Sequence, residues 1–590
     1  MRYQALTIAL LSCAALSCSR RPALKVEVDG IPKQARSLQV LVVSQDSAEV
    51  IPRPTQIDPE PWDIPDDTTS RTSFVLNLPE HYQGKLTVSV AAFDHPGLKG
   101  CIIGLGEKDR VFMPTPLDDS MYVTLTPSPT DHTCEGAGPR VLAVAPGQGG
   151  SDGGTTGEVI GWRFKPGAKV LVDAIAAPNA TYESASRLQV TMPPGPACGR
   201  ANLAVVNLDN TQGTLPAAYR YIPSALSFAP GLYGYPGGIR AITFGQLDPL
   251  SDPNQQMDFV ITTNQSPTNY IYRVLKAQLT SSIPPRDLQN DDWSPAQLSD
   301  VDLDGDLDIV AAGRTMGGVV MWKNDGQGWF ALGGSFVPGE VGSIAISVGD
   351  LNLDGYPDVA SVNETARTVN IYLNDRTGSI PRIPTHIAIK KIQNPSRVAV
   401  LHTTADAYLD VVVADRLTGS LVQIPQLLNG QTAAFPANDI NAPVHELGGP
   451  AGPLVRGDLD GDGLDDLVVP IESRNNLQIF LSTDRPNWTP HQIDACTAPR
   501  AATIADMNCD GQADIIIGCG GAQPSVQILL RQVDGSYKER WSSMLNSTGS
   551  MPTPIGTIFD LAAGDVTDDG KPDIMLATDV GIAYLRNTMP

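Results

Sequence analysis

Charged residues and long apolar runs are both scarce in this sequence. Only 18% of the 590 residues are charged, and 64 acidic residues outnumber 41 basic ones, which gives a formal charge of −23. A chain this acidic is repelled by nucleic acid and by anionic lipid, so we expect neither as a partner. After residue 18 no apolar run approaches the roughly 20 residues that a membrane-spanning helix needs.

Motifs of metal hydrolases and zinc sites are missing. The eight cysteines contain no C-x-x-C pair, and the seven histidines contain no H-E-x-x-H motif. Residues 149–153 match the hydrolase motif G-x-S-x-G, but the strand before it and the helix after it are not indicated. We interpret that match as a flexible turn, and we expect that the protein is not an enzyme.

An export signal opens the chain. Arg2 precedes an apolar run from Ala5 to Ser17, which is too short to span a bilayer as a mature helix. The tetrad ending at Cys18 resembles a bacterial lipobox, and a competing match ends at Cys13; an ordinary secretory signal is the alternative. Cys18 fits the usual signal length better. With Ser19 after it, the resemblance implies a lipidated Cys18 and an outer-membrane lipoprotein that is periplasmic or surface-exposed.

Six cysteines follow Cys18, and export favours disulfide formation among them. Cys101 and Cys134 flank the end of the first domain and are predicted to pair. Cys496 and Cys519 are the next candidates, because they lie at the far end of one predicted strand pair. Two thiols are expected to stay unpaired.

Short apolar runs separated by Gly, Pro, Asn and Asp predict an all-β protein, with 55 Gly and 49 Pro in the chain. Strand-like alternation after the signal (residues 1–18) predicts a β-sandwich over residues 19–136. Residues 137–222 contain Val159–Gly167 and a closing Tyr219-Arg-Tyr221, and they resemble the IPT/TIG family of immunoglobulin-like domains. The resemblance implies a second sandwich that acts as a spacer or a binding module.

A nine-residue motif recurs in residues 223–590. Intact copies begin at Asp300, Asp350, Asp458, Asp506 and Asp565, and a decayed copy begins at His402. Oxygen ligands at positions 1, 3, 5 and 9 and the carbonyl of position 7 can converge on one ion, and Gly at position 6 permits the turn. Such an all-oxygen shell is typical of Ca²⁺, so we expect about five calcium ions that stabilise the fold.

The predicted ligands fall into five sets. They are Asp300, Asp302, Asp304, Asp306 and Asp308; Asp350, Asn352, Asp354, Tyr356 and Asp358; Asp458, Asp460, Asp462, Leu464 and Asp466; Asp506, Asn508, Asp510, Gln512 and Asp514; and Asp565, Thr567, Asp569, Lys571 and Asp573. Arg456-Gly457-Asp458 also spells an integrin-recognition tripeptide. We interpret this as coincidence, because Asp458 is a predicted metal ligand.

Short apolar strands follow these loops, and position 12 is not Glu, as Ala311 illustrates, so the motif is not an EF-hand. The repeats resemble the FG-GAP/VCBS repeats of integrin-α-type propellers over about 360 residues. Copies about 53 residues apart leave room for seven, and Phe244–Asp248 starts a divergent first copy. The resemblance implies a seven-bladed β-propeller preceded by two immunoglobulin-like β-sandwich domains.

The last repeat ends at Pro590, without the fourth strand that earlier repeats have. Residues Ser227–Gly231 are similar to Ser335–Gly339, which begin such a strand region. We therefore predict that residues 224–231 supply the missing outer strand of the last blade.

Two functions fit these features. The first is a monomeric, lipid-anchored scaffold that binds or adheres to a protein or glycan ligand. The second is a calcium-dependent polysaccharide lyase or hydrolase, which needs catalytic side chains clustered on one propeller face. The missing enzyme motifs favour the first.

Overall fold

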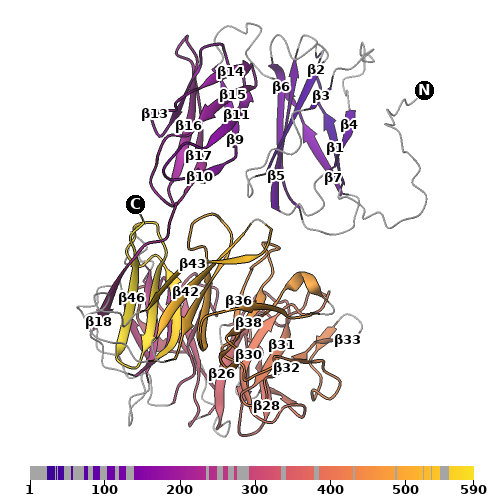
Figure 1. Cartoon of the computed structure of the whole chain (residues 1–590). Helices are drawn as coiled ribbons and strands as arrows, with labels where there is room; N and C mark the ends of the chain where they lie inside the picture. The colour runs from indigo at the N-terminus through magenta and orange to yellow at the C-terminus, as the bar shows by residue number, and fades with distance from the viewer. Residues whose placement is uncertain are drawn as a thin grey trace. The chain divides into compact units, whose positions relative to one another are not determined.

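A computed structural model describes much of the chain, and its regular structure is almost entirely strand (Figure 1). The described residues are 23–32, 35, 37–44, 55–57, 72–77, 84–93, 102–112, 119–127, 138–233, 238–248, 257–263, 271–274, 292–315, 317–333, 341–377, 384–429, 432–485, 488–521, 524–532, 534–544 and 557–589. Within them the helical segments are two 3₁₀ turns, Glu472–Arg474 and Ser482–Asp484. None of these described helices is long and apolar enough to cross a membrane. The all-β prediction is confirmed.

Backbone contacts divide the chain into two compact units. The first comprises residues 1–147, 156–191 and 202–218, and the second comprises residues 148–155, 192–201 and 219–590. Parts of the predicted 137–222 domain therefore group with the long C-terminal region by contact density.

The first unit begins with two sheets, ordered β4-β1-β7 and β3-β2-β5-β6-β8. Their strands are β1 (Ala23–Asp29), β2 (Ser37–Ser44), β3 (Thr55–Ile57), β4 (Thr72–Asn77), β5 (Gly84–Phe93), β6 (Ile102–Phe112), β7 (Asp119–Thr124) and β8 (Thr126–Pro127). Val26 and Val28 alternate with more exposed residues on β1, and Val88 and Val90 are fully buried on β5. The alternation on β1 thus reflects one buried face, whereas on β5 the intervening residues Ser89 and Ala91 are buried as well.

Two further sheets follow, ordered β14-β15-β11-β9 and β10-β17-β16-β12-β13. Their strands are β9 (Arg140–Ala145), β10 (Gln148–Gly150), β11 (Thr156–Trp162), β12 (Lys169–Val172), β13 (Ile175–Ala176), β14 (Thr181–Ser184), β15 (Arg187–Thr191), β16 (Arg200–Val206) and β17 (Gln212–Ile222). Ser151 of the G-x-S-x-G match lies in a turn that leads into a strand, so the strand–turn–helix context of a hydrolase nucleophile is not formed there.

The rest of the second unit consists mainly of seven sheets, which we number along the chain. Sheet 1 is β19-β20-β21, sheet 2 is β22 to β25, sheet 3 is β26 to β29, sheet 4 is β30-β31-β32-β35, sheet 5 is β36 to β39, sheet 6 is β40 to β43, and sheet 7 is β44-β45-β46-β18. The short hairpin β33-β34 stands apart. We call the first three strands of each sheet in chain order its first, second and third strands.

The strand bounds of these sheets show a regular repeat. They are β18 (Phe228–Tyr233), β19 (Ile239–Gly245), β20 (Asp258–Thr263), β21 (Ile271–Val274), β22 (Gln297–Ser299), β23 (Asp308–Ala312), β24 (Val319–Asn324), β25 (Phe330–Leu332), β26 (Ser343–Gly349), β27 (Asp358–Asn363), β28 (Thr368–Tyr372), β29 (Thr385–Ala388), β30 (Pro395–Leu401), β31 (Asp410–Asp415), β32 (Ser420–Ile424), β33 (Leu427–Asn429), β34 (Thr432–Ala434), β35 (Val444–Glu446), β36 (Val455–Gly457), β37 (Asp466–Ile471), β38 (Asn476–Phe480), β39 (His491–Asp494), β40 (Pro499–Ala505), β41 (Asp514–Cys519), β42 (Ser525–Arg531), β43 (Tyr537–Met544), β44 (Ile558–Gly564), β45 (Asp573–Thr578) and β46 (Gly581–Asn587).

The seven sheets close into a ring. Each first strand contacts the first strand of the next sheet, and β44 of sheet 7 contacts β19 of sheet 1. A separate buried cluster fills each interface between neighbouring sheets. Every residue of the second strands is buried, which explains why these strands read as continuous apolar runs without alternation. The arrangement is consistent with β-propeller-like repeats.

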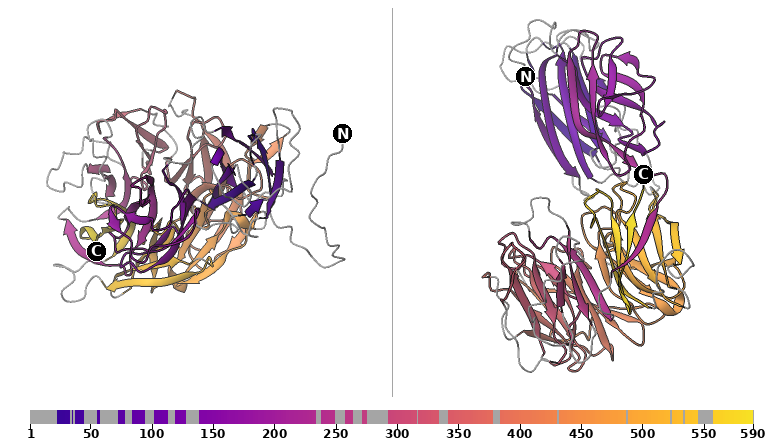
Figure 2. Two further views of the ribbon diagram at one scale, coloured as in Figure 1. Left: turned by 90° about the horizontal axis from the view of Figure 1, so that it is seen from above. Right: turned by 90° about the vertical axis from the view of Figure 1, so that its left-hand side faces the viewer.

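Sheet 7 is completed by a strand from the other end of the ring. β18 pairs antiparallel with β46, in a register from Phe228 with Asn587 to Tyr233 with Ile582. The two strands lie side by side in both figures (Figure 1, Figure 2). The prediction that residues 224–231 supply this strand is confirmed, with its bounds shifted to 228–233. Phe228 also packs edge-on against Trp541 of sheet 6, with ring centroids 4.8 Å apart.

We expect Phe228→Ala to lower the free energy of unfolding by about 1–3 kcal/mol, because the half-buried ring is lost at the closing strand. The exposed neighbour Ala229 gives the control: Ala229→Ser should change stability by less than about 0.5 kcal/mol. Denaturant unfolding of the full chain measures both. Equal stability of the two variants would mean that β18 adds little to ring closure.

Candidate metal centres

In sheets 2, 3, 5, 6 and 7 the nine-residue motif forms the loop between the first and second strands. Its backbone enters the left-handed region twice in every copy. Position 4 has φ of 57° to 60° at Leu303, Leu353, Cys509 and Asp568, and 81° at Gly461. Position 6 is always glycine, with φ from 79° to 97°. An added Cβ at Gly305 would meet nothing within 4 Å, so this glycine is required by its φ and not by space.

The carboxylate at position 1 organises each loop. Asp300 accepts hydrogen bonds from the N–H groups of Asp304 (3.1 Å) and Gly305 (3.0 Å). Asp350, Asp506 and Asp565 accept the same pair of bonds, and Asp458 accepts from Gly461 and Gly463. These bonds turn the loop so that the side chains of positions 1, 3 and 5 face one another.

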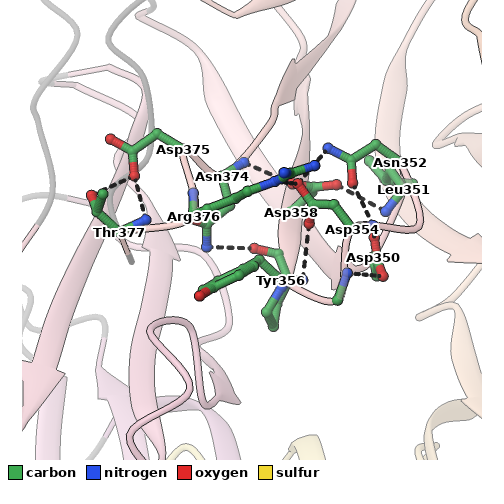
Figure 3. Close-up of polar contacts among 12 residues, drawn as sticks. Asp350, Leu351, Asn352, Asp354, Tyr356, Asp358, Asn374, Asp375, Arg376 and Thr377 are labelled. Atoms are coloured by element: carbon green, nitrogen blue, oxygen red, sulfur yellow. Dashed lines mark hydrogen bonds and ion pairs between the residues drawn. The ribbon is translucent and has the colours of Figure 1, made fainter.

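The aspartate at position 9 is fully buried and begins the second strand. Asp358 accepts from the N–H of Leu351 (2.9 Å) in its own loop and from the N–H of Asn374 (2.7 Å) after the third strand (Figure 3). Asp308, Asp466, Asp514 and Asp573 repeat this pair of bonds. Burial raises the pKa of Asp308, Asp358 and Asp573 to about 6, of Asp466 to about 7 and of Asp514 to about 8.

The same aspartate is present where the rest of the motif is lost. Asp410 in the decayed loop accepts from Thr403 (3.2 Å) and Gln426 (2.9 Å), and Asp258 of sheet 1 accepts from Leu247 (2.8 Å). All seven sheets therefore carry a buried aspartate at this place, a structural role that the sequence did not indicate. The sequence feature that could have indicated this role is that Asp258 and Asp410 stand at the same place, at the start of the second strand, in the repeats without an intact motif.

Two loops bring three acidic side chains together. One carboxylate oxygen from each of Asp300, Asp302 and Asp304 lies within 4.8 Å of the others, and Asp458, Asp460 and Asp462 form the same kind of cluster. Oδ1 of Asp302 is buried and accepts no hydrogen bond from the described residues. An unused buried oxygen beside two further carboxylates fits a hard cation such as Ca²⁺.

The other three loops place Asn352, Asn508 or Thr567 at position 3, so fewer carboxylates converge. Asn352 and Asn508 each turn an amide N–H toward the position 5 aspartate. At position 7 the N–H of Asp306, Tyr356, Leu464, Gln512 and Lys571 donates to position 5, at 2.8 to 3.1 Å. The same backbone bond thus forms whatever the side chain at position 7 is. This agrees with the prediction that position 7 contributes its main-chain carbonyl and not its side chain.

A basic side chain lies beside every intact loop. Examples are Lys323 with Asp302 (3.1 Å) and Arg376 with Asp354 (2.9 Å; Figure 3). Arg220 lies 3.7 Å from Asp506, and longer pairs join Arg456 to Asp465 and Arg586 to Asp569. One basic group cannot balance three to five carboxylates, so each loop keeps an excess of negative charge that a divalent cation would offset.

The decayed loop lacks both features of a metal site. Ala405 and Ala407 at positions 4 and 6 do not enter the left-handed region, and Asp406 is the one carboxylate among positions 1 to 5. His402 contacts the carbonyl of Tyr408 (3.2 Å). The loop keeps its strand connection through Asp410 without a converging ligand set.

Two disulfides lie in the described part of the chain. Cys496 and Cys519, considered from the sequence, are bonded with a Cα–Cα distance of 6.0 Å. Cys198 is bonded to Cys509, at 5.1 Å, although these two thiols were expected to stay unpaired. That expectation was wrong because the partners are 311 residues apart and no local pattern links them. Cys18, Cys101 and Cys134 lie outside the described residues.

Arg456 of the Arg-Gly-Asp tripeptide is engaged inside the ring. Its guanidinium donates to the main-chain carbonyls of Val400 and Val348, on the first strands of sheets 4 and 3. Burial lowers the pKa of Arg456. The contacts agree with the interpretation of the tripeptide as coincidence.

Two segments, residues 300–361 and 458–517, match the family model described as an FG-GAP-like repeat. The chain contains FG-GAP-like repeats. Each match starts at the first residue of a metal loop and ends in the second strand of the next sheet. No curated protein sequence matches the chain.

Several solved structures are similar at low identity. An auxiliary nutrient binding protein from Bacteroides ovatus ATCC 8483 is 12% identical, covers 78% of this chain and 100% of its own, and has a TM-score of 0.32. One from Bacteroides thetaiotaomicron VPI-5482 is 9% identical, with coverage of 77% and 98% and a TM-score of 0.32. A functionally unknown protein from Desulfotomaculum acetoxidans DSM 771 is 11% identical, with coverage of 57% and 92% and a TM-score of 0.33. These values assign no function to this chain.

Replacing the aspartate by asparagine should affect protein stability differently at position 9 and at position 5. In Asp308→Asn an amide N–H faces the N–H of Val301 or Asn324, so we expect a loss of about 1–3 kcal/mol even in chelator. Asp304→Asn keeps its acceptor oxygen and should reduce only the stabilisation that calcium adds. Thermal unfolding with and without chelator separates the two effects. A calcium-dependent loss in both variants would contradict the structural role of position 9.

Proposed function

We propose that the seven sheets are the blades of a seven-bladed β-propeller over residues 223–590. The ring of first strands and the seven interface clusters support this proposal. Two immunoglobulin-like β-sandwich domains precede it, over residues 19–136 and 137–222, and the second is of the IPT/TIG type.

The proposal includes structural calcium in the five intact loops. The supporting observation is that the position 1 and position 9 carboxylates of each loop accept backbone N–H groups, as Asp300 and Asp308 do, while in the loops that begin at Asp300 and Asp458 carboxylate oxygens of positions 1, 3 and 5 also lie within 4.8 Å of one another. Bound Ca²⁺ supplies positive charge that relieves this repulsion. The residues of the loop orient the carboxylates and join the first strand to the second. A metal held in this way stabilises a frame and leaves the surface of the ring for recognition.

We further propose that the protein is a monomeric scaffold, exported and anchored by lipid at Cys18 in the outer membrane, facing the periplasm or the cell surface. It binds a protein or glycan ligand and does not transform it. Glycan arrays and pull-downs from the native cell surface, with the calcium-loaded full chain, test the binding role. Release of shortened products from a bound polysaccharide would favour the alternative of a lyase or hydrolase.

The chain should bind about five calcium ions, because five loops have the intact motif. Equilibrium dialysis after chelation measures the number, and calcium should also raise the unfolding temperature. Binding of one ion or none would contradict the proposed role of the loops.

Cys18→Ala should move the protein from the membrane fraction to the soluble fraction, because the lipid anchor is lost. Mass spectrometry of the wild-type protein from membranes should find a lipidated N-terminus at Cys18. Cys13→Ala is the matched control and should leave the protein in the membrane. An unmodified N-terminus elsewhere would overturn the anchoring proposal.

A further inference from the structure

A cavity of about 580 Å³ lies in the ring, and residues from all seven sheets and their adjoining turns line it. It is near the beginning of the first strands, whereas the metal loops follow their ends. In sheet 3 the first strand begins beside Ile344 of the cavity and leads to Asp350 of the metal loop. Asp350 follows Ile344 by six residues of extended chain, which corresponds to a distance of about 20 Å. The cavity is thus distinct from the metal loops, and its volume is that of a small-molecule site.

Backbone irregularities aim side chains into this cavity. In five sheets the pairing of the first and second strands shifts near the start of the first strand, which leaves one residue without a partner across the sheet. These residues are Arg240, Ile344, Ser396, Arg500 and Phe559. All but Ser396 line the cavity. Bulges commonly redirect side chains at functional places, and here the same bulge recurs around one opening.

The cavity is unusually basic for so acidic a chain. Its lining contains five arginines and four acidic residues, which are Arg240, Arg314, Arg397, Arg416, Arg500, Asp292, Glu364, Asp560 and Asp579. Asp292 pairs with Arg240 (2.8 Å) and Arg314 (3.4 Å), and Glu364 pairs with Arg314 and, at 4.0 Å, with Arg416. Arg500 pairs with Glu472, which lies outside the lining (2.6 Å).

Arg397 is the arginine of the lining that takes part in none of these ion pairs. No described carboxylate lies within 4.0 Å of its guanidinium, which donates to the main-chain carbonyl of Ser396 (3.0 Å). The side chain is exposed, yet the protein around it and the charge of Arg416 lower the pKa of Arg397, and the charge of Asp560 acts in the opposite direction. A guanidinium in such a place has N–H groups available for a planar anion.

The remaining lining suits an apolar body. Ile344, Leu454 and Phe559 lie around the opening, and Phe559 is 45% exposed. The nearby Asp560 accepts the N–H of Ile242 (3.1 Å), and burial raises its pKa to about 7. Asp560 is therefore partly protonated near neutral pH, so it opposes an incoming anion less than an ordinary carboxylate does.

We propose that this cavity binds a small organic acid, whose single carboxylate pairs with Arg397 and whose ring or aliphatic body packs on Phe559 and Leu454. The proposal deepens the proposed binding function and rests on it. A single carboxylate matches the one guanidinium of the lining for which no carboxylate within 4.0 Å is described, whereas a dianionic phosphate would bring a second negative charge among the acidic residues of the lining. The carboxylate can belong to an acidic sugar or to the end of a peptide.

Isothermal titration of the calcium-saturated full chain tests the site. Glucuronate and N-acetylleucinate represent the two sources, and glucuronamide and N-acetylleucinamide are their neutral counterparts. We expect at least one carboxylate to bind, with its amide at least tenfold weaker. The acid that binds identifies the source. Failure of both acids to bind at millimolar concentrations would overturn the proposal.

Variants of Arg397 test its role in the same titration. Arg397→Gln should weaken carboxylate binding at least tenfold, and Arg397→Lys should retain part of it, because charge remains without the planar fork. Arg187→Gln, which removes a guanidinium paired with Glu158 in the first unit, is the matched control and should change nothing. If Arg397→Gln does not fold, the lysine variant decides. Unaltered carboxylate binding by the lysine variant, or by Arg397→Gln where it folds, would refute the role of Arg397. If a ligand found on the glycan array binds Arg397→Gln as well as it binds the wild type, the proposed scaffold function stands and the proposed carboxylate site is refuted.

Discussion

The structure of the ring depends on one buried carboxylate in each sheet. An aspartate at the start of the second strand joins the loop before it to the residue after the third strand through main-chain N–H groups. A buried carboxyl group in such a place is tolerated because both oxygens are hydrogen-bonded. In the two sheets without the intact motif, Asp410 keeps both bonds and Asp258 keeps the bond to the loop before it. The connection between the first and second strands is therefore made without the nine-residue motif in these two sheets.

Side-chain amides then connect one sheet to the next. Asn324, Asn374 and Gln426 each donate to a carbonyl in the loop of the preceding sheet, at Leu247, Val301 and Leu351. The same groups also donate within their own sheet. Apolar clusters fill the space between these contacts. The conformation of one loop is thus linked to the position of the neighbouring sheet.

Short-range features were the ones that the sequence could predict. Positions 1, 3, 5 and 6 of a loop such as 350–358 are neighbours in the chain, so their chemistry is visible as a motif. Ring closure was predictable because Ser227–Gly231 is similar to a segment of a complete repeat. Cys198 and Cys509, the left-handed backbone of Leu353, and the bulges at Arg240 and Arg500 could not be predicted. They follow from tertiary contacts or strand register, which no local pattern records.

The pairing of β18 with β46 also determines the order in which the ring can be completed. Ser227 and Thr588 are hydrogen-bonded at 3.0 Å although 361 residues separate them. The last sheet therefore cannot form completely until residues 582–587 have been synthesised. Until then the edges of β19 and of the newest sheet are open to other strands. Such a late, long-range step slows folding and lengthens the time for which aggregation competes.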